Sequence, residues 1–102
     1  MIFALICKDR PGKLEVRLAN RPAHLDYLTA LNEAGKLKFA GPLIGDDGKP
    51  FGSLVAVEAD DRAGAQAIAA SDPYAKADLF ESVEISQWNW VFNAPKAQTE
   101  AR

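Results

Sequence analysis

Two segments of this chain carry apolar residues at both odd and even positions, and that feature limits its fold more than any other. In residues 2–8 every side chain except the last is apolar, and residues 53–58 contain the unbroken run Leu-Val-Ala-Val. Because successive side chains of a strand point to opposite faces, such strands bury both faces. The sequence therefore predicts a sheet whose central strands need cover on each side.

The first helical region follows residues 2–8 after a loop that contains Pro and Gly. A short helical turn is expected at residues 13–19, and a longer helix is expected to begin at Pro22, where a missing N–H costs nothing. Asn20 is placed to cap this helix, and Gly35 is a typical residue to end it.

The second helical region begins at Asp60 or Asp61, since either aspartate is a suitable N-cap. Its alanines and one isoleucine form a face of small apolar residues. The run Ser-Asp-Pro-Tyr then interrupts the helix, and Pro73 predicts a new helical turn with Asp72 as its N-cap.

The remaining strands are bounded by turn-forming residues. Residues 37–40 predict a short strand that ends at Gly41-Pro42, and residues 45–50 predict a hairpin loop. The last strand is expected at residues 82–92, and its apolar residues change from one parity to the other along its length. A β-bulge, or a change in which face is covered, would explain that change.

The predicted order is strand, helix, strand, strand, helix, strand, which is the ferredoxin-like or split βαβ arrangement. We therefore expect an α+β fold with a four-stranded antiparallel sheet and two helices on one face. One domain should span residues 1–93, and residues 94–102, which lack periodicity, should form a mobile tail. Because helices cover only one face, a second copy of the sheet is the simplest cover for the other, which predicts a homodimer through the sheet faces.

Composition argues against several classes of function. The net charge of −2 and the lack of a basic run argue against a nucleic-acid partner. The apolar segment 1–7 is too short to span a membrane. One histidine and one cysteine, far apart, provide no zinc spacing, and the glycines form no phosphate loop, so neither metal nor cofactor is expected. A lone Cys7 cannot form an internal disulfide, which suits the cytoplasm.

The only histidine, His24, lies early in the longer predicted helix. It stands at the edge of an apolar face formed by Leu25, Leu28 and Leu31. A lone histidine on such a face is compatible with two interpretations. It is either a buried structural side chain or the general base of a small-molecule site.

Four short motifs resemble those of one known family. They are Arg21-Pro22-Ala23-His24, Gly41-Pro42, Gly52-Ser53 and Asp72-Pro73-Tyr74. In order and spacing they are similar to motifs of the YciI (YCII-related) proteins over about residues 1–92. The resemblance implies a dimeric α+β barrel and a His–Asp active site, here His24 and Asp72, with Ser53 nearby. Related enzymes of this architecture include muconolactone isomerases and a dehydrochlorinase that acts on a chlorinated aromatic compound.

Each candidate residue also has a plain structural interpretation. Asp72 before a proline has the form of a helix cap, and both roles are compatible if one carboxylate oxygen stays free for His24. Ser53 is compatible with turn chemistry, and Arg21 with either an anionic ligand or solvated surface. Tyr74 is compatible with a pocket wall or with simple packing. The expected substrate-binding residues are Ser53, Arg21, Tyr74 and Pro42.

The favoured function is a cofactor-independent lyase or isomerase. Asp72 would accept a hydrogen bond from His24 Nδ1 and leave Nε2 free as a base for proton abstraction or dehydrohalogenation. The alternative is a non-catalytic binding or accessory module that holds a small acidic metabolite in the same pocket. An enzyme requires the free ring nitrogen to face an open cavity, whereas a binding module does not.

Overall fold

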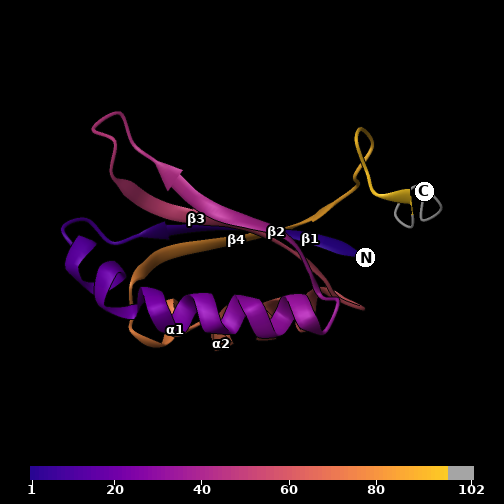
Figure 1. Ribbon diagram of the computed structural model, residues 1–102, viewed down its shortest axis with the longest axis horizontal. Helices are drawn as coiled ribbons and strands as arrows, with labels where there is room; N and C mark the ends of the chain where they lie inside the picture. The colour runs from indigo at the N-terminus through magenta and orange to yellow at the C-terminus, as the bar shows by residue number, and fades with distance from the viewer. Residues whose placement is uncertain (97–102) are drawn as a thin grey trace.

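The structure, a computed structural model, describes residues 1–96 and consists of one sheet with its helices on one side (Figure 1). Its elements are β1 (Ile2–Asp9), α1 (Leu14–Glu33), β2 (Leu37–Ile44), β3 (Pro50–Glu58), α2 (Arg62–Ser71), α3 (Pro73–Lys76) and β4 (Phe80–Trp88). The strand order is β2-β3-β1-β4 with antiparallel neighbours, so β1 and β3 are central. This confirms the predicted α+β ferredoxin-like fold. Part of the predicted tail, residues 97–102, lies outside the described residues.

The helix-facing side of β1 and β3 holds the core. Its central row consists of three register pairs: Phe3 with Val57, Leu5 with Val55, and Cys7 with Ser53. These six side chains are at most 4% exposed. Ser53 is the one strongly polar member of the row, and on its other side it pairs with Pro42 of β2. The core therefore ends in a hydroxyl group close to the β2 edge of the sheet.

β2 is longer than predicted, because Gly41-Pro42 continue the strand and do not end it. The reason is its position: β2 is an edge strand, and proline is tolerated there because its missing N–H can face the side that has no neighbouring strand. Pro42 accordingly keeps its register opposite Ser53. β3 also begins earlier than predicted, at Pro50, so the hairpin loop is short.

α1 corrects the prediction for the first helical region. It is one helix that starts at Leu14 and runs through Pro22, and Asn20 donates to the Val16 carbonyl and does not cap a new helix. Pro22 lacks the N–H that would bond one turn back, and Figure 1 shows α1 bending after its first turns. The inward face therefore includes Arg17 as well as His24, whereas Leu18 is 56% exposed.

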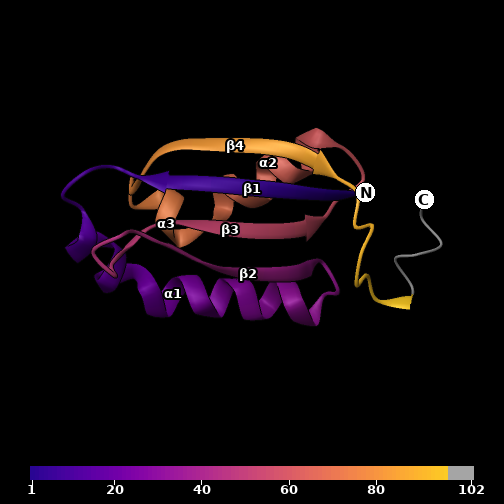
Figure 2. The ribbon, with the colours of Figure 1, turned by 90° about the horizontal axis from the view of Figure 1, so that it is seen from above.

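The second helical region follows the prediction closely. Asp61, one of the two candidate caps, accepts a hydrogen bond from the Gly64 N–H at 2.8 Å at the start of α2. Asp72 caps α3 and accepts from the Tyr74 N–H at 2.9 Å. Figure 2 shows α1 alongside β2 and α2 beneath β1 and β4, with α3 between the two longer helices. This arrangement brings the start of α3 to the inward face of α1.

β4 ends at Trp88, four residues earlier than predicted. Its register with β1 is continuous from Ser82 to Trp88, and the only shift lies next to Phe80, so no bulge explains the change of parity. Instead, the apolar residues of β4 change from the helix-facing side of the sheet to the side without helices. Trp88 and Trp90 each pack edge-to-face on Phe39 of β2, with ring centroids 5.5 and 5.4 Å apart, and so cover one end of the sheet face that lacks helices. No helix among residues 1–96 is long and apolar enough to cross a membrane.

Candidate active site

A cavity of about 260 Å³ lies where α1 meets the β2–β3 edge of the sheet. The polar and ring-bearing side chains in its wall are Arg17, Arg21, His24, Pro42, Ser53 and Tyr74. Three of these residues are basic, and none of the residues in the wall carries a carboxylate. Five of the six residues named from the sequence thus meet at one cavity, and the sixth, Asp72, lies behind His24. The nitrogen and hydroxyl groups of this wall suit a ligand that carries several oxygens.

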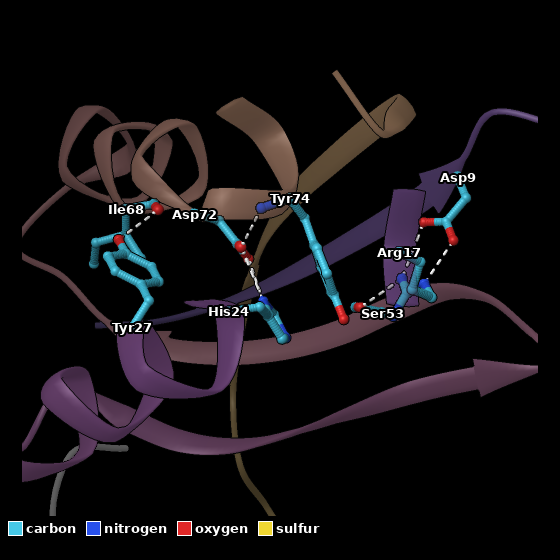
Figure 3. Close-up of polar contacts among 8 residues, drawn as sticks. All are labelled: Asp9, Arg17, His24, Tyr27, Ser53, Ile68, Asp72 and Tyr74. Carbon is cyan, nitrogen blue, oxygen red and sulfur yellow. Dashed lines mark hydrogen bonds and ion pairs between the residues drawn. The ribbon is translucent and has the colours of Figure 1, made fainter. Parts of the chain in front are cut away.

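His24 points inward from α1 and is 6% exposed. Its Nδ1 atom lies 2.8 Å from Oδ1 and 3.1 Å from Oδ2 of Asp72 (Figure 3). An ionised carboxylate only accepts hydrogen bonds, so the proton of the neutral imidazole belongs on Nδ1. The other ring nitrogen, Nε2, is then an acceptor, and Figure 3 shows that end of the ring directed away from Asp72.

Asp72 is both a helix cap and the partner of His24. The same oxygen, Oδ1, accepts from the Tyr74 N–H and from His24 Nδ1. A separate oxygen for each role is not needed, because one carboxylate oxygen has enough lone pairs for two donors. The cap therefore fixes the carboxylate on α3, and the carboxylate in turn fixes the orientation of the imidazole. Asp72 is 5% exposed, which shields this pair from water.

The Tyr74 ring lies between His24 and Arg17. It stacks on the imidazole with a centroid distance of 3.9 Å and an interplanar angle of 14°. The Arg17 Cζ atom lies 4.6 Å from the ring centroid, and Figure 3 shows the two side chains on opposite sides of the ring. Burial raises the pKa of the Tyr74 hydroxyl, although the charges of Arg17 and Arg21 act in the opposite direction. Tyr74 is therefore a neutral hydrogen-bonding group at neutral pH.

Arg17 is the site residue that sequence reasoning missed. It is 4% exposed, and its Nε and Nη2 atoms donate to the two carboxylate oxygens of Asp9 at 2.6 and 2.9 Å. Nη2 also donates to Ser53 Oγ at 3.0 Å. Burial lowers the pKa of Arg17, but the hydrogen bond and charge of Asp9 prevail and raise it. One available signal was spacing: Arg17 and His24 are two helical turns apart and share a face once the helix runs through Pro22.

Two further residues of the cavity wall lie nearer the surface, and Cys7 lies in the sheet next to Ser53. Arg21 is exposed, and Pro42 forms part of the β2 wall. Cys7 lies in the sheet below, where burial, followed by the charge of Asp72, raises the pKa of its thiol to about 12, so it is an unreactive group at neutral pH. Among residues 1–96, no group of three or more His, Cys, Asp or Glu side chains is placed to hold a metal ion.

The fold is that of a small α+β protein with its helices on one face of an antiparallel sheet, and a buried His–Asp pair lies beside a cavity. The model of the YCII-related domain matches residues 1–89, and the chain therefore belongs to the YCII-related family. The protein YciI of Escherichia coli is 36% identical over 98 residues, which cover 90% of this chain and all of that protein. A curated protein of Haemophilus influenzae without an assigned function is 34% identical over the same share of each chain.

Solved structures agree with this assignment. The 5-chloro-2-hydroxyhydroquinone dehydrochlorinase TftG of Burkholderia phenoliruptrix, solved with 2,5-dihydroxybenzoquinone, is 36% identical and superposes with a TM-score of 0.78. The match covers 86% of this chain and 93% of TftG. A NIPSNAP domain protein of Burkholderia xenovorans has a TM-score of 0.52 and 18% identity over 94% of this chain and all of that protein, which supports the fold alone.

Proposed function

We propose that this protein is a cofactor-independent lyase that removes a proton from a small oxygenated ring, with His24 as the base. The observation that carries the proposal is the buried His24–Asp72 pair. Asp72 bonds Nδ1 of His24, and His24 is part of the cavity wall. A purely structural histidine has no need of a cavity beside it. The carboxylate stabilises the imidazolium that forms when Nε2 accepts a proton, which makes proton abstraction easier.

The cavity indicates the size and charge of the substrate. Its volume of about 260 Å³ falls just below the range of roughly 300–1,000 Å³ that holds drug-sized ligands, so it suits a single ring or a short acid. Arg21 favours negative charge, and Ser53 and Tyr74 offer hydroxyl groups to ring oxygens. A polyhydroxylated ring of the kind that TftG acts on meets all of these requirements.

Dehydrochlorination of such a ring needs only proton transfers. One hydroxyl proton moves to the carbon that bears chlorine, and a second hydroxyl then loses its proton while chloride leaves with the electron pair of the C–Cl bond. The products are a hydroxybenzoquinone and HCl, so no oxidant is required. A single base that accepts and returns protons, as Nε2 of His24 would, is sufficient for both steps.

The direct test is release of chloride from 5-chloro-2-hydroxyhydroquinone by the purified protein. We expect turnover by the wild type and a loss of about 10²–10⁴-fold in kcat for His24→Asn, which keeps a donor toward Asp72 but has no base. Asp72→Asn should lose less, because the histidine remains but is poorly oriented. Thr29→Ala, on the exposed side of the same helix, is the matched control and should keep full activity.

Two results would contradict the proposal. One is unchanged turnover by a folded His24→Asn variant. The other is tight binding of 2,5-dihydroxybenzoquinone without turnover of any related halogenated ring, which would identify the alternative, a binding or accessory module. Retained folding of His24→Asn, measured by circular dichroism, is needed to separate loss of the base from loss of a core side chain.

We also propose that the protein acts as a homodimer in the cytoplasm. Ala4, Ile6, Leu43 and Leu54 lie by strand alternation on the face without helices and are only partly buried. The Trp88–Trp90–Phe39 cluster covers one end of that face. A second copy of the sheet would bury the remaining apolar surface. The lone buried Cys7 is consistent with a reducing compartment.

A further inference from the structure

The guanidinium of Arg17 is held more rigidly than a side chain that only supplies charge. Its two bonds to Asp9 fix the plane of the group, and the two side chains of this ion pair are 5% and 7% exposed. The Tyr74 ring packs on it as well. One donor of the fixed group, Nη2, reaches Ser53 Oγ. The position of the Ser53 hydroxyl is therefore set by a buried ion pair from β1 and α1.

The chemistry of the two groups decides the direction of this hydrogen bond. An arginine has donors only, whereas a hydroxyl has one donor and two lone pairs. Ser53 must therefore accept from Arg17, which leaves its own proton for a different acceptor. Within residues 1–96, no second hydrogen bond of the Ser53 hydroxyl is present, and Ser53 lines the cavity. The acceptor for this proton would be an oxygen of the bound ligand.

We propose that Arg17 is a positioning residue that commits the Ser53 hydroxyl to donate a hydrogen bond to a ring oxygen of the substrate. This inference rests on the proposed function and specifies which group recognises the oxygenated ring. A cationic donor behind a hydroxyl strengthens the bond that the hydroxyl itself donates, because hydrogen bonds in a chain polarise one another. Asp9 contributes to this positioning, because it holds the Arg17 guanidinium in the required orientation.

The test is a double-mutant cycle on the binding of 2,5-dihydroxybenzoquinone, measured by isothermal titration calorimetry. We expect Ser53→Ala to weaken binding about tenfold, which is typical of one lost hydrogen bond. Arg17→Lys keeps the positive charge beside Asp9, but one ammonium group cannot bond both carboxylate oxygens and Ser53 in one plane. It should weaken binding several-fold. The double variant should bind no more weakly than Ser53→Ala, because Arg17 acts through Ser53.

The outcomes separate this inference from the proposed function. Additive effects in the cycle would overturn the role of Arg17 while chloride release still supported the His24 base. Wild-type protein that does not bind the quinone would overturn the inference, since it assigns the Ser53 donor to oxygens of this kind. Loss of chloride release with a coupled cycle would contradict only the proposed function. If Arg17→Lys does not fold, Asp9→Asn replaces it in the cycle with the same expectation.

The matched control for Arg17→Lys is Arg10→Lys. Arg10 also pairs with an aspartate, Asp78, but both side chains are largely exposed. Such a surface pair contributes little to stability, and Arg10 is not part of the cavity wall. Arg10→Lys should bind the quinone as tightly as the wild type. Equal weakening by the two lysine variants would show that the effect does not depend on the place of Arg17 in the cavity wall, and it would overturn the positioning role.

Discussion

Gly52 lies where the backbone of β3 passes close to the backbone of β1, immediately before Ser53. A Cβ atom at this position would clash with the Cys7 carbonyl oxygen, which is part of the backbone and cannot move aside. Gly52 therefore lets β3 pack against β1 immediately before Ser53. The requirement is steric, because its backbone does not need the left-handed conformation that glycine favours.

Gly52→Ala should lower the free energy of unfolding by about 1–3 kcal/mol, the usual cost of overpacking, measured by urea denaturation. Gly41→Ala is the matched control, since a Cβ at this second strand glycine meets no atom within 4 Å. The control should remain within about 0.5 kcal/mol of the wild type. Equal stability of the two variants would contradict the close approach of the two strands.

The sequence predicted the His24–Asp72 half of the candidate site but not the half formed by Arg17 and Asp9. His24 and Asp72 were found because a lone histidine and an Asp-Pro cap are conspicuous and matched a family pattern. Arg17 and Asp9 were not found, because a proline was expected to begin the helix after Arg17. No local pattern indicates that an arginine and an aspartate will form a buried ion pair, since that depends on how β1 and α1 pack.

The sequence reduced the N-cap of α2 to two candidate residues but could not choose between them. Two adjacent aspartates precede α2, and only Asp61 accepts the Gly64 N–H. Asp61→Ala should lower the free energy of unfolding by about 1 kcal/mol, because one backbone donor at the helix start loses its partner. Asp60→Ala, at the exposed neighbouring position, should change it by less than about 0.5 kcal/mol. Urea denaturation of both variants checks this, and a larger loss for Asp60→Ala would show that the cap is misassigned.

The elements themselves were predictable in order but less so in extent. Two of the errors of length involve a proline inside an element, at Pro22 within α1 and at Pro42 within β2. Local rules treat proline as a boundary, yet a helix packed along its length tolerates a bend and an edge strand tolerates a missing donor. Whether an element is packed along its length or lies at an edge depends on the whole fold, so it cannot be predicted from the neighbouring residues alone.

For the whole molecule, neighbouring positions on β3 report on opposite faces of the sheet. Val55 is 4% exposed in the core beneath the helices, whereas Leu54 lies on the face without helices. Val55→Glu should unfold the domain, because an unpaired charge would be buried. Leu54→Glu should leave the domain folded and convert the proposed dimer into a monomer. Analytical ultracentrifugation with circular dichroism checks both, and a monomeric wild type at micromolar concentration would contradict the dimer.

The central claim is that Nε2 of His24 is a free base facing the cavity while Asp72 holds Nδ1. Because the chain has one histidine, ¹⁵N NMR of the imidazole ring reports this residue alone. We expect the neutral ring to carry its proton on Nδ1 and the Nε2 signal to shift when 2,5-dihydroxybenzoquinone binds. A proton on Nε2 of the neutral ring, or an Nε2 signal unchanged at saturating quinone, would contradict it.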